Sequence, residues 1–305
     1  MSVAIDSVLM VGFGGPTRPD EVRPFLDHVL RARPVPRERY EEVVHHYERI
    51  GGRSPYNDLT MRQAAALGAA LARDGIAIPI EVGMRNSNPF IEDAMRRLAE
   101  RGARRTLAFI MAAYRSEASF ERYQRNVGEA RAKLGARAPE IDYPLPWHAH
   151  PMFVRATAAR VAEAFARLDV RARAGARLIC TAHSIPIAMA NASHYVAQLQ
   201  ETVRLSAAAL GIEDWTLAYQ SRSGSAREPW LEPDVLSVLK TLDGRAVVVA
   251  PIGFLCDHVE VLYDLDIEAA AVAYEHGIRL ERAATVGDHP DFIAMIASIV
   301  RGHRA

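Results

Sequence analysis

The chain has 305 residues, of which 50% are hydrophobic and 24% charged, and its 37 basic residues (Lys and Arg) equal its 37 acidic ones. This composition excludes a disordered, collagen-like or disulfide-rich chain. The formal net charge of zero offers no general attraction to nucleic acid or to an anionic membrane. We therefore expect a globular protein without a nucleic-acid partner, long enough for two domains or for one large α/β unit.

The start of the chain, MSVAIDSVLMVGFGGP, lacks the basic segment and the small-residue cleavage site of a signal peptide. No stretch approaches the roughly 20 uninterrupted apolar residues of a membrane-spanning helix. These features predict a cytoplasmic protein with no integral membrane association.

Short apolar runs rich in β-branched residues alternate along the chain with longer segments whose apolar residues recur about every 3.6 positions. The short runs predict strands at residues 7–11, 78–82, 106–111, 177–182, 215–219, 245–251 and 278–282. The longer segments predict helices that include residues 63–73, 90–101, 195–210 and 290–300. Strand–helix alternation over the whole length predicts an α/β fold, with parallel sheets covered by helices on both faces.

Two such halves fit the length, with a break near residue 150, where the segment 142–151 (DYPLPWHAHP) is rich in Pro and His. We therefore predict an N-terminal α/β half over residues 1–150 and a C-terminal α/β half over residues 151–305. Ligands of doubly wound sheets bind at the carboxyl ends of the strands. The residues that directly follow the strands are thus the first candidates for a functional site.

The first predicted strand runs into the glycine-rich sequence GFGGP at residues 12–16. Glycines after a first strand can indicate a dinucleotide-binding turn, but that motif needs a further Gly where Thr17 stands. The glycines predict either a tight turn or a turn that lets a flat ligand approach the backbone closely.

The fourth predicted strand ends near His183, which is followed by Ser-Ile-Pro. A lone His is more often structural than functional. Its place at the carboxyl end of a strand favours a functional role, because imidazole titrates near neutrality and ligates Fe, Zn and Cu.

After the sixth predicted strand, Glu260, Asp264 and Glu268 recur every fourth residue and would form one acidic stripe on a helix. No Lys or Arg lies between Ala246 and Ile278 to neutralise the stripe. Each pair of like charges at this spacing costs about 0.2–0.5 kcal/mol. The stripe is therefore either a solvated acidic face or a row of carboxylates that handles cations or protons, and the spacing alone leaves both interpretations open.

Taken together, these segments resemble the ferrochelatase family, and the resemblance covers nearly the whole chain. The matching motifs are GFGGP (12–16), YERIGGRSPYN (47–57), NPFIEDAMRRL (88–98), TAHSIP (181–186), EPWLEPDV (228–235) and GFLCDHVEVLYDLDIEAA (253–270). The resemblance implies a chelatase-like fold of two similar Rossmann-like domains, each with a four-stranded parallel sheet flanked by helices, with a porphyrin cleft between them. It also implies an enzyme that inserts Fe²⁺ into a porphyrin in haem synthesis, with release of two protons.

The resemblance also implies which residues handle the metal. His183 and Glu260 would form the catalytic, metal-handling pair. Asp264 and Glu268 would continue from this pair as a carboxylate path along a helix that is locally π-like.

For the porphyrin, the resemblance implies contacts with the side chains Phe13, Arg31, Tyr47, Ser54 and Tyr123. Arg33 is an alternative to Arg31 as the partner of a propionate. Three positions depart from the pattern of coproporphyrin-type enzymes: Phe13 replaces a Tyr that reaches the iron, and His46 and Leu30 each replace an Arg. These departures concern substrate recognition and leave the metal-handling pair intact.

Cysteine usage bears on cofactors. Cys180 and Cys256 are the only two cysteines, and both stand in apolar stretches typical of reduced core residues. They are too few for an iron–sulfur cluster, which normally takes four. We expect no permanently bound cofactor and no iron–sulfur cluster, with Fe²⁺ as a substrate.

The porphyrin and the class of activity have alternatives. The absence of a C-terminal extension, together with the SRSG run at 221–224 and the EPWLEP run, favours coproporphyrin III over protoporphyrin IX. We expect the protein to act as a monomer. A cobalt or nickel chelatase of the same fold stays open, because these metals often bind such sites more tightly than Fe²⁺. A non-catalytic tetrapyrrole-binding protein is the alternative from another class.

Overall fold

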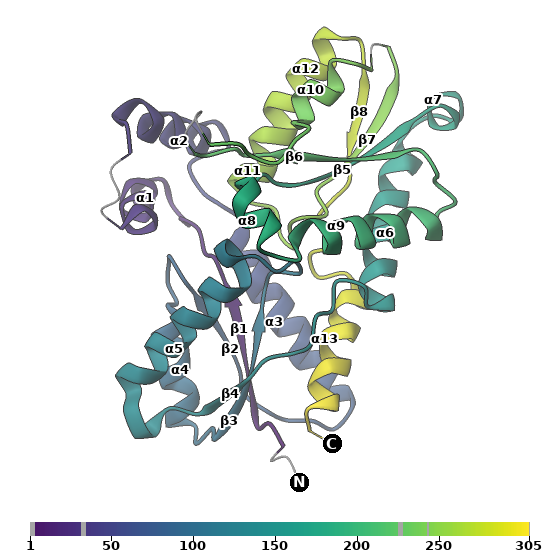
Figure 1. The fold of residues 1–305 in the computed structure, drawn as a ribbon. Coiled ribbons are helices and arrows are strands. Elements are labelled where there is room, and N and C mark those ends of the chain that lie inside the picture. Colours follow the sequence, from purple (N-terminus) through teal and green to yellow (C-terminus); the bar gives the residue numbers. More distant parts are fainter. Residues whose placement is uncertain (1–3, 32–34, 225–227, 243, 305) are drawn as a thin grey trace. The chain divides into compact units, whose positions relative to one another are not determined.

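The computed structural model describes residues 4–31, 35–224, 228–242 and 244–304. The strands of this part of the chain form two parallel sheets (Figure 1), with the strand orders β2-β1-β3-β4 and β6-β5-β7-β8. The chain divides into two compact units, and each unit contains one of the sheets. The first unit comprises Met1–Ala112, Ala118–Trp147 and Asp288–Ala305. The second comprises Ala113–Glu117 and His148–Gly287.

The first unit is built around the earlier sheet. Its strands are β1 (Ser7–Gly12), β2 (Ile80–Met84), β3 (Arg105–Ile110) and β4 (Glu140–Asp142). Its α-helices are α1 (Val22–Leu30), α2 (Arg37–Arg49), α3 (Tyr56–Arg73), α4 (Ile91–Glu100), α5 (Arg122–Leu134) and α13 (Pro290–Gly302). Its 3₁₀ turns are η1 (Pro19–Glu21) and η3 (Gly135–Arg137), and the π-helix η2 (Glu117–Glu121) precedes α5.

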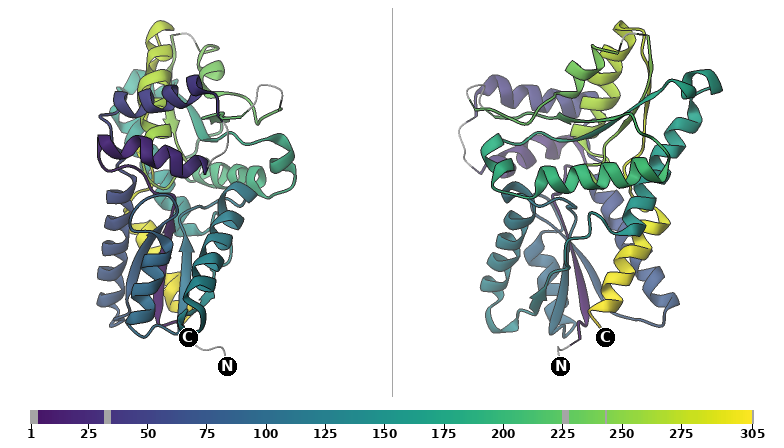
Figure 2. Two further views of the ribbon diagram at one scale, coloured as in Figure 1. Left: turned by 90° about the vertical axis from the view of Figure 1, so that its left-hand side faces the viewer. Right: turned by 45° about the vertical axis from the view of Figure 1, so that its right-hand side comes forward.

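Every residue of the central strand β1 is buried, because helices cover both faces of the sheet. On one face, alternate residues of β1 and β3 form a core cluster with α4 and α5. On the other face, Phe109 of β3 stacks on Trp147 with ring centroids 5.3 Å apart, and Trp147 contacts Phe292 of α13 at 5.9 Å. The helices α3 and α13 lie side by side on this face (Figure 2).

The second unit is built around the later sheet. Its strands are β5 (Arg177–His183), β6 (Trp215–Gln220), β7 (Ala246–Ala250) and β8 (Arg279–Arg282). Its helices are α6 (Pro151–Arg167), α7 (Val170–Ala174), α8 (Ile187–Asn191), α9 (Tyr195–Ala209), α10 (Val235–Leu239), α11 (Val259–Leu262), the π-helix η4 (Asp264–Ala269) and α12 (Ala270–Glu275). The helices α6 and α9 cover one face of the sheet, and α10, η4 and α12 cover the other.

The segment α11-η4-α12 has one apolar side, which faces this sheet. Val261, Leu265, Ala269 and Ala273 recur every fourth residue and are buried in the core cluster with β5, β6 and β7. The acidic residues predicted as a stripe each precede one of these apolar residues along the chain. Burial of the apolar side therefore fixes the rotation of the helix and the direction of its carboxylates.

The structure confirms the predicted architecture of two four-stranded parallel sheets flanked by helices. Each of the seven predicted strands is present with its bounds shifted by a few residues at most, and one strand, β4, was not predicted. The division of the chain differs from the predicted halves in two respects. The helix α13 belongs to the first unit and packs on α3, and the segment Ala113–Glu117 belongs to the second unit. Within the described ranges, no helix combines the length and apolar character that crossing a membrane requires.

Candidate active site

His183 is the last residue of the central strand β5, which pairs with β6 on one side and β7 on the other. In the register of β5 and β6 it lies opposite Gln220, and its carbonyl oxygen accepts a hydrogen bond of 2.9 Å from the Tyr195 hydroxyl. The ring Nδ1 contacts the carbonyl oxygen of Ser184. Because a carbonyl only accepts, Nδ1 carries a hydrogen, and Nε2 is the nitrogen that is left for a proton or a metal ion.

Nε2 of His183 lies 3.5 Å from Oε1 of Glu260, and the two side chains are 28% and 36% exposed. Burial disfavours the charged imidazole, but the charge of Glu260, its hydrogen bond, the Ser184 carbonyl and the charge of Asp264 together raise the pKa of His183 to about 9. Without a metal, the pair therefore holds a proton at neutral pH. A metal ion that binds the same two side chains must displace this proton.

Glu260 is held at the start of the short helix α11 by a histidine cap. Nδ1 of His258 accepts a hydrogen bond of 3.2 Å from the backbone N–H of Glu260. The cap needs Nδ1 without its hydrogen, so the ring must be neutral, with its hydrogen on Nε2. Burial lowers the pKa of His258 and thereby favours the neutral ring that the cap requires.

The two residues of the predicted carboxylate path, Asp264 and Glu268, lie in the π-helix η4. The backbone N–H of Glu268 donates to the carbonyl oxygen of Tyr263 at 3.0 Å, a bond that spans five residues as in a π-helix. The N–H of Ile267 donates to the same oxygen at 3.2 Å. The locally π-like helix that the family resemblance implies is thus present, with Asp264 at its first position.

Asp264 is largely buried, and two side chains from the end of β6 hold it. The hydroxyl of Ser221 donates to its Oδ2, and Nε2 of Gln220 lies 3.4 Å from the same oxygen. Nε2 of Gln220 also donates to the backbone carbonyl of Glu260 at 2.6 Å. Burial raises the pKa of Asp264 to about 7; the Ser221 hydroxyl opposes this rise, and the charges of Glu260 and Glu268 add to it.

Gln220 and Ser221 contact the predicted site residues, but neither was predicted from the sequence. Ser221 has a φ of 62°, in the left-handed region where residues other than Gly are strained and which is enriched at functional sites. Their position could have indicated a role in the site, because both stand at the carboxyl end of β6, beside the strand that carries His183. The SRSG run begins at Ser221, but the sequence did not indicate that its hydroxyl would contact a carboxylate.

The glycine-rich turn after β1 lies in the first unit. A side chain at Gly14, whose φ is 87°, would collide with Ser87, and a Cβ at Gly15 would lie 2.6 Å from the Cβ of Ser54. The backbone N–H of Gly15 also donates to Oδ1 of Asn57 at 3.0 Å. Close packing inside the unit accounts for these glycines, which supports the tight-turn interpretation.

Phe13 and Tyr47, two of the predicted porphyrin contacts, meet the same aromatic ring. Phe25 lies edge-on to Phe13 with ring centroids 6.3 Å apart and edge-on to Tyr47 at 6.2 Å. Phe13 is partly exposed, whereas Tyr47 is 4% exposed. The structure therefore brings these two residues into one aromatic row of the first unit.

The remaining predicted porphyrin contacts lie in different settings. Ser54 and Tyr123 are 4% and 7% exposed, and Tyr123 belongs to the core cluster between α4, α5 and the sheet. Arg31 is exposed and ends α1 with a φ of 49°. Arg33 lies outside the described residues. Contact of these side chains with a porphyrin stays a prediction.

The second unit also contains both cysteines. Cys180 and Cys256 are free and buried, and burial raises the pKa of the Cys180 thiol to about 12. In the parts of the chain that the structure describes, no group of three or more His, Cys, Asp or Glu side chains is arranged to hold a metal ion. Of the four predicted metal residues, the structure pairs His183 with Glu260 and places Asp264 near both.

Comparison with known proteins gives closely similar sequences. Residues 6–304 match the sequence profile of the family described as Ferrochelatase. A protein named Ferrochelatase from Rhodopirellula baltica is 42% identical over 300 residues, which cover 97% of this chain and 85% of that protein. Proteins named Coproporphyrin III ferrochelatase are 40% identical in Mycolicibacterium smegmatis and 39% identical in Nocardia farcinica, and each match covers at least 98% of this chain and 89% of the relative.

Solved structures share the fold at much lower identity. SirB from Bacillus subtilis with Fe³⁺ matches with a TM-score of 0.60 and 14% identity, covering 98% of this chain and 95% of that one. CbiX, described as the terminal enzyme for biosynthesis of sirohaem in denitrifying bacteria, matches with a TM-score of 0.54 and 16% identity, covering 97% and 98%. At these identities the likeness shows a common fold alone.

Proposed function

Because this chain belongs to the ferrochelatase family, we propose that it inserts Fe²⁺ into coproporphyrin III as a step of haem synthesis. The observation that carries the proposal is the pair formed by Nε2 of His183 and Oε1 of Glu260, 3.5 Å apart at the carboxyl end of a central strand. An imidazole nitrogen and a carboxylate oxygen are both suitable ligands for iron and acceptors for a proton.

The reaction requires three things of the protein. The ion must lose water, the porphyrin nitrogens must become accessible, and the two pyrrole protons must leave. His183 and Glu260 can replace water around the ion and accept a proton, one role at a time. Asp264, whose pKa lies at about 7, can both take up and release a proton near neutral pH, and Glu268 extends this route along the π-helix.

The choice of porphyrin rests on the relatives and on surface cations. Several relatives at about 40% identity carry the name Coproporphyrin III ferrochelatase. Coproporphyrin III has more propionate groups than protoporphyrin IX, and the exposed guanidinium of Arg31 suits a bidentate contact with one of them. Phe13 is partly exposed and offers a ring for stacking on a macrocycle.

Other features of the proposal rest on the sequence. We propose that the enzyme has no iron–sulfur cluster, since its only two cysteines are buried in the second unit. The monomeric state and the cytoplasmic location stay predictions.

An anaerobic insertion assay tests the proposal. Coproporphyrin III and protoporphyrin IX are each incubated with Fe²⁺, Co²⁺ or Ni²⁺, and metallation is followed by absorbance. We expect the highest kcat/KM for Fe²⁺ and coproporphyrin III. Preference for protoporphyrin IX would contradict the porphyrin assignment, and preference for Co²⁺ or Ni²⁺ the metal assignment. An absorbance shift without metallation by any ion would indicate a tetrapyrrole-binding protein instead.

A further inference from the structure

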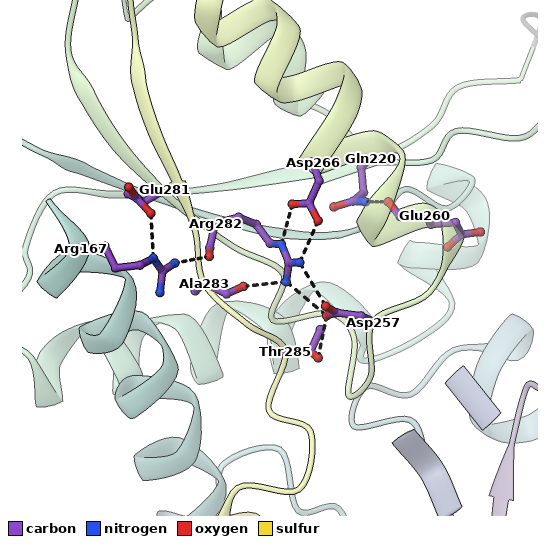
Figure 3. Close-up of polar contacts among 9 residues, drawn as sticks. All are labelled: Arg167, Gln220, Asp257, Glu260, Asp266, Glu281, Arg282, Ala283 and Thr285. Carbon is purple, nitrogen blue, oxygen red and sulfur yellow. Dashed lines mark hydrogen bonds and ion pairs between the residues drawn. The ribbon is translucent and has the colours of Figure 1, made fainter. Parts of the chain in front are cut away.

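Arg282 is the last residue of the edge strand β8, and its side chain points toward residues 257–268, which we call the acidic segment of the second unit (Figure 3). Its side chain is 16% exposed, although it belongs to a residue type that is almost never buried without a partner. The run without cations from Ala246 to Ile278 ends at Arg279, which binds Asp169 and lies three residues before Arg282. Its low exposure indicates that Arg282 supplies positive charge to the carboxylates of residues 257–268.

The guanidinium of Arg282 binds two carboxylates at once. Its Nε and Nη2 donate to the two oxygens of Asp266, both at 2.8 Å. Its Nη1 and Nη2 lie 3.3 and 3.1 Å from the two oxygens of Asp257. Nη1 also lies 3.4 Å from the carbonyl oxygen of Ala283, and Thr285 donates to Asp257 at 2.9 Å. The planar fork of N–H donors is thus fully used.

The two partners of Arg282 lie on either side of the metal-handling carboxylates. Asp257 stands three residues before Glu260, in the loop that leads into α11, and Asp266 stands two residues after Asp264, inside η4. Residues two positions apart point to nearly opposite sides of a helix. In Figure 3 the carboxylate of Glu260 accordingly points away from Arg282. Arg282 thus binds the segment on the side away from the Glu260 carboxylate.

We propose that Arg282 is a positioning residue for metal insertion, which fixes the loop before α11 and the π-helix η4 so that Glu260 and Asp264 keep their places relative to His183. The inference rests on the proposed function and adds a residue that does not itself touch metal or porphyrin. A shift of about 1 Å in a reacting group can cost up to about 100-fold in rate. Loss of the contacts of Arg282 with Asp257 and Asp266 should therefore reduce turnover. Lys cannot replace Arg282 fully, because a single ammonium group cannot bind two carboxylates in bidentate fashion.

A purely stabilising ion pair is the competing explanation, and Arg167 provides the matched control. Arg167 donates to Glu281 at 2.8 Å and to the backbone carbonyl of Arg282 at 2.6 Å, so it binds the same edge strand. It is an arginine of the same unit with an ion pair of its own, and its side-chain hydrogen bonds go to β8 and to the Glu163 carbonyl of α6. A variant of Arg167 therefore loosens the strand without releasing Asp257 or Asp266.

The experiment compares Arg282→Gln, Arg282→Lys and Arg167→Gln with the wild-type chain. The readouts are kcat and porphyrin KM for insertion of Fe²⁺ into coproporphyrin III, and hydrogen exchange of residues 257–268. We expect kcat of Arg282→Gln to fall at least about tenfold with porphyrin KM changed less than about twofold. Arg282→Lys should lie between Arg282→Gln and the wild type, and both should exchange faster in residues 257–268. Arg167→Gln should match the wild type in both readouts.

Three results would overturn the inference: an unchanged kcat in Arg282→Gln, a loss confined to porphyrin KM, or an equal loss of kcat in Arg167→Gln. If Arg282→Gln does not fold, Arg282→Lys and Asp266→Asn take its place, and the double variant should lose no more activity than the worse single variant. If the wild-type chain inserts no iron into any porphyrin, the proposed function fails. The exchange of residues 257–268 then decides the role of Arg282 by itself.

Discussion

Hydrogen bonds hold His183 in place more than packing of its ring does. Its backbone carbonyl is held by Tyr195 and its Nδ1 by Ser184, while 28% of the side chain stays exposed. Removing the ring therefore leaves no large cavity in the core. We therefore expect the contribution of His183 to be chemical, so that its loss separates activity from stability.

We expect His183→Ala to lose at least about 100-fold in kcat for iron insertion, since a positioned proton-transfer group contributes about 10²–10⁴. Its melting temperature should remain near that of the wild type. The assay is the anaerobic insertion rate, with circular dichroism to confirm the fold. Activity within a factor of about two of the wild type would show that His183 does not act on the metal or on the porphyrin protons.

Asp264 makes the folded protein sensitive to pH. Its pKa lies at about 7 in the folded chain and at about 3.9 in an unfolded one, so the folded state keeps a proton that the unfolded state has released. The stabilisation that this proton contributes is therefore fully present below about pH 4 and is lost as the pH rises through about 7. Its upper bound is about 4 kcal/mol.

Asp264→Asn removes this pH dependence because an amide does not titrate. Without metal, we expect the variant to melt at a higher temperature than the wild type at pH 8 and at a similar temperature near pH 4, while its turnover is lower. Thermal denaturation at several pH values measures the difference. A variant that is equally destabilised at every pH would show that the hydrogen bonds from Ser221 and Gln220 outweigh the charge.

At the scale of elements, the caps and ends of short helices decide where the site residues point. The helix α11 has only four residues, Val259–Leu262, and its N-terminus depends on the His258 side chain. Helices this short gain little from their own backbone bonds. The position of Glu260 should therefore depend on the cap.

We expect His258→Ala to lower stability by about 1 kcal/mol, as for other lost caps, and to lower kcat because Glu260 is less well held. His258→Asn should recover most of both losses, since Asn is among the best capping residues. Urea denaturation and the insertion assay measure the two effects. If His258→Asn is as inactive as His258→Ala, the imidazole itself takes part in the reaction and the cap is not its main role.

The sequence predicted those elements whose pattern is local. Buried central strands give continuous apolar runs, and seven strands were predicted on this basis. β4 escaped prediction because its three residues, Glu140–Asp142, include two acidic ones. Its place depends on pairing with β3 and on the ion pair between Arg105 and Asp142 at 2.6 Å, which no local pattern reveals.

The same limit applies to the site. The strand-end rule, the spacing of the acidic residues and the family motifs together predicted His183, Glu260 and Asp264 as site residues, and the structure brings these three side chains close together. The roles of Gln220 and Arg282 depend on contacts with residues at least 16 positions away in the chain. Such contacts are set by strand register, and single-sequence patterns carry little information about it.

At the scale of the whole molecule, the first unit is assembled from segments far apart in the chain. The helix α13 contributes six buried residues to it, among them Phe292, which is fully buried against Trp147. The backbone N–H of Ile5 also donates to the carbonyl oxygen of His303 at 3.2 Å. The stability of the N-terminal sheet therefore depends on residues after position 287.

We expect Phe292→Ala to destabilise the first unit by about 3–5 kcal/mol, the usual cost of truncating a buried Phe. Hydrogen exchange should rise mainly in β1 and β3. Phe153→Ala, at a residue of α6 that is 1% exposed, is the matched control and should instead raise exchange in β7 and β8. If both variants raise exchange equally in both sheets, the two units do not unfold separately.

The late position of α13 also governs how the chain folds during its synthesis. The ribosome completes residues 113–287, which contain the entire second unit, before α13 emerges. The second unit can therefore fold first, against the usual order in which N-terminal domains fold earliest. Until α13 arrives, the ring of Trp147 and the neighbouring face of the first sheet lack their packing against Phe292. Because transiently exposed apolar surface is prone to aggregation, we expect the nascent chain to be most vulnerable before α13 is synthesised.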